Sequence, residues 1–114
     1  MKAAVFKAPG KPLSIENIDD PKCGENEMIL KVQQCGICGT DLHASDGGSM
    51  EPETGTIFGH EFSGEIVEIG KNLKTSFKIG EPAVSLPFIS CGTCQACMNG
   101  NPFFCSTNMQ STGM

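Results

Sequence analysis

The chain has 114 residues, of which 39% are hydrophobic and 18% are charged. That length and balance indicate one globular domain of ordinary size and exclude a disordered segment. The net charge of −5, with no cluster of Lys or Arg, argues against a nucleic-acid partner. No apolar run approaches the roughly 20 residues that a membrane helix needs, so no membrane partner is expected either.

Cysteine usage and the first residues indicate the cellular compartment. Seven cysteines is an odd number, whereas a secreted disulfide framework usually has an even one. The opening segment, residues 1–7, is typical of an amphipathic strand and not of a signal sequence. These features predict a cytoplasmic protein with reduced cysteines.

Short strands separated by turns are predicted at 2–7, 13–18, 28–32, 61–69 and 83–86. Thr40 is expected to be the N-cap of a short helical turn through residues 41–43, and residues 44–57 are expected to form an exposed loop. Gly64, inside the fourth strand, indicates a bulge or close backbone packing. With fourteen Gly and seven Pro, the chain is predicted to be mainly all-β, a small barrel or sandwich.

Four cysteines lie close together near the end of the chain, with two, two and seven residues between them: Cys91, Cys94, Cys97 and Cys105. This spacing favours a closed tetrahedral zinc site, which shapes a loop and does no chemistry. An iron–sulfur cluster and four unrelated thiols are the alternatives, but cluster spacings usually differ from this one. Few aliphatic residues follow Ser90, so we expect metal to supply the folding energy of this lobe.

A second, open metal site is indicated by Cys38, His60 and Glu61. A catalytic zinc typically keeps three protein ligands and one exchangeable position. Cys38 and His60 supply two ligands, and Glu61 is a candidate for the third. From the residues alone, a single His beside a strand is more often structural than a ligand.

Three motifs together resemble the zinc-dependent medium-chain alcohol dehydrogenases. They are Cys38-Gly39-Thr40-Asp41-Leu42-His43, then Gly59-His60-Glu61-Phe62-Ser63-Gly64 with Gly70, and then the four cysteines. The resemblance covers essentially the whole chain. It implies that residues 1–114 form the N-terminal GroES-like catalytic domain, a partly open β-barrel with a cysteine loop stapled by a structural zinc over residues 90–106.

The resemblance also implies the roles of individual residues at the open site. Cys38 and His60 would be ligands of the catalytic zinc, with Glu61 a neighbouring or alternate ligand. Asp41 would be the carboxylate that fixes the His60 imidazole, as metal-bound histidines commonly require. The resemblance assigns no role to Cys23 or Cys35.

Two further residues are implied to handle the proton that an alcohol loses. Thr40 matches the hydroxyl that hydrogen-bonds the substrate alcohol, although a plain helix cap is the alternative. His43 matches the far end of a proton relay, and its alternative is a solvent-exposed residue. A hydroxyl followed by an imidazole offers a proton a route to solvent.

The sequence departs from the family chiefly in what it lacks. Family members are much longer and continue into a Rossmann domain, but no Gly-x-Gly-x-x-Gly run occurs here. NAD(P) would therefore bind only with that missing domain, and no residue of this chain is assigned to the cofactor. The third catalytic ligand of most members lies beyond Met114. A smaller departure is Gly80-Glu81-Pro82-Ala83, where the family has Gly-Asp-Arg-Val.

The expected full-length protein transfers hydride between NAD(P) and a small alcohol, aldehyde or ketone, and is a homo-oligomer. The alternative is a stand-alone zinc-binding module with a structural or interaction role and no catalysis. A co-chaperonin is disfavoured because the cysteine motifs would have no purpose in it. The isolated chain is expected to be inactive, and its substrate is not indicated by these residues.

Overall fold

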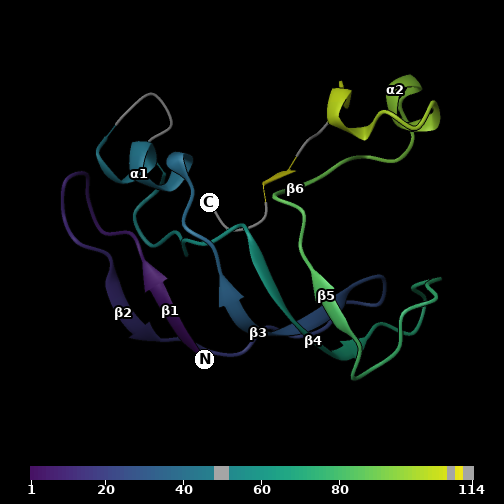
Figure 1. Ribbon diagram of the computed structural model, residues 1–114, viewed down its shortest axis with the longest axis horizontal. Coiled ribbons are helices and arrows are strands. Elements are labelled where there is room, and N and C mark those ends of the chain that lie inside the picture. The colour runs from purple at the N-terminus through teal and green to yellow at the C-terminus, as the bar shows by residue number, and fades with distance from the viewer. Residues whose placement is uncertain (48–51, 108–109, 112–114) are drawn as a thin grey trace.

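The computed structural model describes residues 1–47 and 52–107 and the backbone of residues 110–111. Within these ranges the chain is mainly β, as predicted, and its strands form three antiparallel sheets (Figure 1). The strands are β1 (Lys2–Val5), β2 (Ser14–Asn17), β3 (Met28–Cys35), β4 (Phe62–Ile69), β5 (Pro82–Val84), β6 (Phe88–Ile89) and β7 (Gln110–Ser111). The described sheets are open and do not close into one barrel.

The chain opens with the predicted hairpin. β1 pairs antiparallel with β2 in a register that places Lys2 opposite Asn17 and Val5 opposite Ser14. Gly10 in the connection has a φ of 66°, a left-handed conformation that glycine adopts without steric cost. After β1 the side chain of Phe6 is buried and stacks on Phe58, with 5.6 Å between ring centroids. The small described core therefore forms around the end of this hairpin.

The central sheet has the order β3-β4-β5. Its β3–β4 register shifts between Val32 and Gln34, opposite Gly64 and Ser63, which confirms the irregularity predicted at Gly64. A Cβ placed on Gly64 would lie 2.2 Å from the carbonyl oxygen of Lys31, so glycine permits a close approach of the two backbones. β5 is an edge strand, which explains why it tolerates a proline.

The helix α1 (Gly39–Ser45) begins one residue before the predicted cap. Cys38, not Thr40, is its N-cap, so that expectation was wrong. The sulfur of Cys38 accepts the Thr40 backbone N–H at 3.3 Å, and the Asp41 carboxylate accepts the Cys38 N–H at 2.9 Å. This reciprocal pair is a capping box in which a thiol replaces the usual hydroxyl.

α1 also shortens the loop predicted over 44–57. The helix runs to Ser45, the Ala44 side chain is fully buried, and Gly10 donates its N–H to the Ser45 carbonyl at 2.8 Å. Residues 48–51 of that predicted loop lie outside the described residues. α1 is thus fastened to the turn of the opening hairpin.

The last part of the chain forms a separate lobe that projects from the sheets (Figure 1). It contains α2 (Gln95–Met98) and the 3₁₀ helix η1 (Pro102–Phe104), which lie against each other. Phe88 of β6 and Phe103 of η1 meet edge to face, with 4.8 Å between centroids. In the described ranges no helix has both the length and the apolar character needed to cross a membrane.

Candidate metal centres

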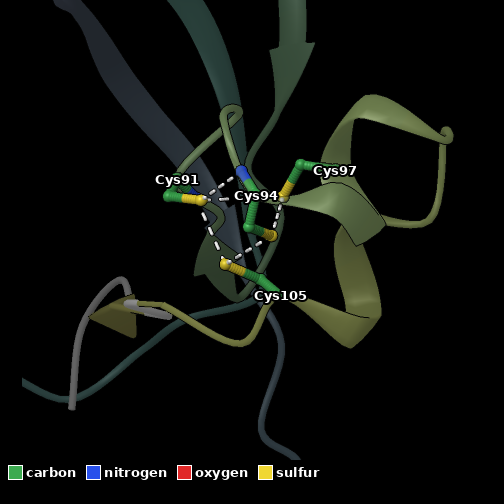
Figure 2. A group of neighbouring side chains, drawn as sticks. All are labelled: Cys91, Cys94, Cys97 and Cys105. Atoms are coloured by element: carbon green, nitrogen blue, oxygen red, sulfur yellow. Dashed lines mark hydrogen bonds between the residues drawn. The ribbon is translucent and has the colours of Figure 1, made fainter.

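The four predicted lobe cysteines converge on one point (Figure 2). The sulfur of Cys94 lies 3.4 Å from that of Cys97 and 4.0 Å from that of Cys105, and the sulfurs of Cys91 and Cys97 are 3.9 Å apart. Four thiolates at about 2.3 Å from a tetrahedral zinc ion stand about 3.8 Å from one another. The observed spacing therefore fits a single tetrahedral ion.

The same distances bear on the iron–sulfur alternative. In an iron–sulfur cluster the four cysteines are divided among two or four irons, so the ligand sulfurs are spread around the cluster. Here the four sulfurs all lie within 4.8 Å of one another, and three of their separations are 3.4, 3.9 and 4.0 Å. The structure has the seven cysteines as thiols rather than disulfides, which leaves all four lobe sulfurs available to a metal.

Backbone amides prepare the lobe for thiolate charge. The Cys94 N–H donates to the sulfur of Cys91 at 3.3 Å, and the Cys91 N–H donates to the sulfur of Cys105 at 3.4 Å. Hydrogen bonds from the backbone of Thr93 and Cys94 lower the pKa of Cys91 to about 5. Burial and the neighbouring Cys94 thiol raise the pKa of Cys97 to about 11. One thiolate is therefore favoured before a metal arrives, and further protons must leave when it binds.

The lobe has no other charge to organise it. All 21 charged residues precede Pro82, so residues 82–114 contain no Asp, Glu, Lys or Arg. Among the described residues, α2 and η1 make their main contacts with each other. A small segment with neither a core nor ion pairs needs another source of folding energy, and four convergent thiolates can obtain it from a metal.

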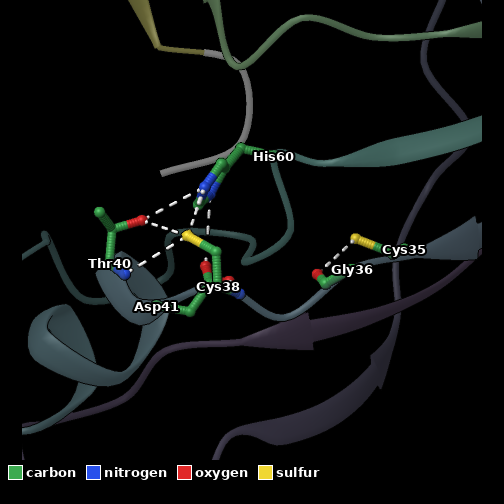
Figure 3. A network of polar contacts seen from close by, with 6 residues as sticks. All are labelled: Cys35, Gly36, Cys38, Thr40, Asp41 and His60. Carbon is green, nitrogen blue, oxygen red and sulfur yellow. Dashed lines mark hydrogen bonds and ion pairs between the residues drawn. The ribbon is translucent and has the colours of Figure 1, made fainter.

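The second predicted site forms where the start of α1 meets the start of β4 (Figure 3). The sulfur of Cys38 lies 3.1 Å from Nε2 of His60 and 2.7 Å from Oγ1 of Thr40. Thr40 Oγ1 is also 3.2 Å from the same His60 nitrogen. In a tetrahedral zinc site, a thiolate and an imidazole nitrogen stand about 3.5 Å apart. The pair therefore fits a metal if it opens by a few tenths of an ångström.

Asp41 lies behind the His60 ring. Its Oδ1 is 3.3 Å from His60 Nδ1, and the two residues are only 7% and 5% exposed. Neither atom has an aligned hydrogen-bond partner among the described residues, so each is the other's polar neighbour. Because a carboxylate only accepts, it favours a proton on Nδ1 and leaves the Nε2 lone pair facing Cys38. That is the tautomer a metal ligand needs.

Two backbone connections hold His60 in this place. Before it, Phe58 donates its N–H to the Ala4 carbonyl at 2.9 Å, which ties this segment to β1. After it, Gly36 donates its N–H to the Glu61 carbonyl at 2.7 Å, which extends the β3–β4 pairing beyond Cys35. His60 is therefore held between a backbone contact to β1 on one side and the extended β3–β4 pairing on the other.

The structure does not bring every predicted site residue to this point. The ligand atoms of Cys38, Asp41 and His60 lie within 4.8 Å of one another, and Glu61 is not in that group. Glu61 is exposed, and its carboxylate lies beside Gly36. His43 is exposed on α1. The candidate site is therefore Cys38, His60, Thr40 and Asp41.

Sequence reasoning missed one neighbour of the site, Cys35, which was left without a role. Its sulfur lies against Gly59, the residue before His60. One sequence feature could have indicated it: Cys35 lies three residues before Cys38, so both cysteines are at or just beyond the end of β3. The contact itself depends on strand register, which the sequence does not state.

The described residues thus form a mainly β domain that carries four convergent cysteines and, separately, a buried Cys–His pair. Residues 24–114 match the alcohol dehydrogenase GroES-like domain family, and the chain belongs to that family. It is 40% identical over 108 residues to an alcohol dehydrogenase of Geobacillus stearothermophilus, covering 92% of this chain and 31% of that protein.

Two further relatives show the range of the similarity. An L-threonine 3-dehydrogenase of Bacillus licheniformis is 36% identical over 110 residues, which are 93% of this chain and 32% of that protein. The solved structure of an alcohol dehydrogenase from E. coli CFT073, complexed with the cofactor NADH, is 32% identical with a TM-score of 0.83. That match covers 100% of this chain and 32% of the other. The chain thus spans about a third of the length of the relatives it matches.

Proposed function

We propose that this chain is the N-terminal catalytic domain of a zinc-dependent alcohol dehydrogenase. The complete enzyme would oxidise a small alcohol, or reduce an aldehyde or ketone, with NAD(P) as the hydride carrier. One observation carries the proposal: a buried His60 that has Asp41 on one ring nitrogen and the Cys38 sulfur on the other. The names of the relatives, alcohol dehydrogenase and L-threonine 3-dehydrogenase, support the reaction class.

Cys38 and His60 are the residues that would hold the catalytic zinc. Bound zinc supplies a Lewis acid that lowers the pKa of a substrate hydroxyl. Asp41 keeps the proton of His60 on Nδ1 and so maintains Nε2 as a ligand. Glu61 would have to swing from its exposed position to become a third ligand, and otherwise that ligand comes from outside this chain.

Thr40 and His43 are the residues that would handle the substrate proton. Thr40 Oγ1 lies 2.7 Å from the Cys38 sulfur and 3.2 Å from His60 Nε2. A substrate hydroxyl that approaches these two ligands would therefore also contact Thr40. His43 follows three residues later on the same helix and is exposed. We infer that the Thr40 hydroxyl takes the substrate proton as it releases its own, and that His43 is the far end of the route by which that proton reaches solvent.

The remaining features of the enzyme belong to the same proposal. The lobe at residues 90–106 would hold a structural zinc, and a Rossmann domain outside this chain would bind NAD(P). NADH bound to the similar E. coli alcohol dehydrogenase supports a nicotinamide cofactor. The odd number of cysteines supports a cytoplasmic location, and we expect the complete enzyme to form homo-oligomers.

The first test is the zinc content of the chain purified without chelator. We expect a ratio near two per polypeptide, falling to near one in Cys38→Ala with an unchanged circular dichroism spectrum. An unchanged zinc content in Cys38→Ala would contradict the catalytic site. A wild-type ratio near one would confine metal binding by this chain to the cysteine lobe and would contradict a catalytic centre built from these residues alone. In the longer protein, Cys38→Ala should abolish alcohol-dependent reduction of NAD(P).

A further inference from the structure

The side chain of Cys35 occupies the space beside the residue that precedes His60. A Cβ placed on Gly59 would lie only 2.6 Å from the Cys35 sulfur. Gly59 has a φ of 113°, in the region that side-chain-bearing residues rarely adopt. Gly59 is therefore held in a turn that only glycine fits comfortably, and Cys35 closes the side of that turn where a Cβ would stand.

Cys35 is itself held by the sheet. It is the last residue of β3 and pairs with Phe62 of β4. The next residue, Gly36, donates its N–H to the Glu61 carbonyl at 2.7 Å. The segment before Cys38 thus contacts residues on both sides of His60: Gly59 through the Cys35 sulfur and Glu61 through the backbone.

Cys35 does not share the ligand cluster. Figure 3 shows it apart from Cys38, Thr40 and Asp41, and its sulfur contacts the Gly36 carbonyl at 3.5 Å. Its sulfur is also outside the group whose ligand atoms lie within 4.8 Å of one another. An effect of Cys35 on the site would therefore act through the backbone, and its sulfur lies beside the Gly59–His60 segment.

We propose that Cys35 is a positioning residue for His60. By filling the space beside Gly59, its sulfur sets where the turn ends, and so sets the ring of His60 between Asp41 and Cys38. This inference rests on the proposed function, because it assigns His60 as a metal ligand. Residues that orient a metal ligand commonly change metal affinity by 10–100-fold when they are altered.

Two substitutions separate volume from chemistry. Cys35→Ile keeps a good strand residue but adds bulk at the γ position, where the sulfur of the exposed Cys35 lies beside Gly59. Cys35→Ser keeps nearly the original shape and should rescue the site. Cys23→Ile is the matched control, since it changes the other non-ligand cysteine, which contacts the Gly24 and Glu27 carbonyls instead.

The first measurement is the imidazole ¹⁵N chemical shifts of His60 in the metal-free chain, which report how the ring faces Asp41. Cys35→Ile should move both His60 nitrogen signals, whereas Cys35→Ser and Cys23→Ile should leave them in place. The far-ultraviolet circular dichroism of all three should match the wild type. Unmoved His60 signals in a folded Cys35→Ile chain would overturn the proposal.

The second measurement is titration with Co²⁺, whose visible spectrum distinguishes four thiolates from one thiolate with an imidazole. Cys35→Ile should weaken the Cys38–His60 site at least about 10-fold and leave the four-cysteine site unchanged. Equal affinity at both sites in Cys35→Ile and wild type would overturn the positioning role. A wild-type chain that takes no second Co²⁺ would instead contradict the proposed function, and the His60 signals would still decide the role of Cys35.

Discussion

The two candidate metal centres are assembled in opposite ways. The four candidate ligands of the lobe centre come from one stretch of chain, Cys91 to Cys105. Apart from the β6–β7 pair, the regular elements described in the lobe are two short helices, α2 and η1. The second centre joins Cys38 to His60 across 22 residues, through strands that pair independently of any metal. A local centre can order its own loop, whereas a distant pair needs a sheet to bring it together.

The two centres also differ in whether their residues would leave a coordination position open for substrate. Four thiolates would complete the tetrahedron around a zinc ion in the lobe and leave no position for substrate. Cys38 and His60 supply two ligands, and the Thr40 hydroxyl lies beside both. We expect order in the lobe to depend on metal and order at the second centre to depend on strand register, so the following changes should break one without the other.

The largest effect is expected from Cys94→Ser. This change removes one of four thiolates from a lobe that has no charged residue and no described core of its own. Structural zinc in small domains contributes on the order of 10 kcal/mol, so the lobe should lose its order. Limited proteolysis should cut within 91–105, while hydrogen exchange in β3 and β4 stays slow. Protease resistance equal to that of the wild type would count against a structural metal.

Gly64→Ala should disturb the second centre and spare the lobe. Its Cβ would stand 2.2 Å from the Lys31 carbonyl oxygen, so β3 and β4 must separate at the bulge that sets the register. We expect a loss of about 2–3 kcal/mol in the free energy of unfolding, typical of overpacking, together with weaker metal binding at Cys38.

Gly39→Ala is the control for that change, because nothing lies within 4 Å of the added methyl group at this helical position. Its unfolding free energy should stay within about 1 kcal/mol of wild type. Chemical denaturation of both variants measures the difference. Similar stabilities for Gly64→Ala and Gly39→Ala would show that the β3–β4 bulge is not a constraint.

Asp41→Asn tests the orientation of His60 with a smaller change. An amide oxygen can still accept the Cys38 N–H and cap α1, but the amide no longer offers the carboxylate charge to His60 Nδ1. We expect the metal affinity of the second centre to fall about 10–100-fold, with no change at the lobe. Competition with a coloured chelator would measure both affinities, and equal losses at the two centres would point to a general folding defect.

The smallest difference should appear in the response to pH. Metal binding replaces protons on thiols, so affinity rises with pH and falls on acidification at both centres. The pKa of Cys97 is raised to about 11, so this thiol is protonated at neutral pH and must lose its proton when metal binds. The pKa of Cys91 is lowered to about 5, so Cys91 has largely lost its proton already. Even with Cys91 already deprotonated, the lobe has more thiol protons to release than a centre with a single thiol. Zinc affinity measured from pH 6 to 8 should therefore change more steeply at the lobe, and parallel slopes would argue against four thiolate ligands.

Local features of this protein were readable from the sequence because their causes are local. The spacing of Cys91, Cys94, Cys97 and Cys105 is confined to one loop, and the hairpin at residues 2–18 follows from strand patterns around a glycine turn. The bulge at Gly64 was predictable for the same reason, because a glycine inside a strand often marks a bulge or a close approach of two backbones. The pairing of Cys38 with His60 was predicted too, but from a motif resemblance and not from geometry.

Tertiary structure decided the rest, and the reason is that strand register is a long-range property. The pairing of Cys35 with Phe62 ends β3 shortly before α1, whose cap is Cys38 and not Thr40. It also placed Glu61 away from the ligand cluster and the sulfur of Cys35 against Gly59. The sequence by itself determined which residues can bind metal, and the β3–β4 register decided which of them meet.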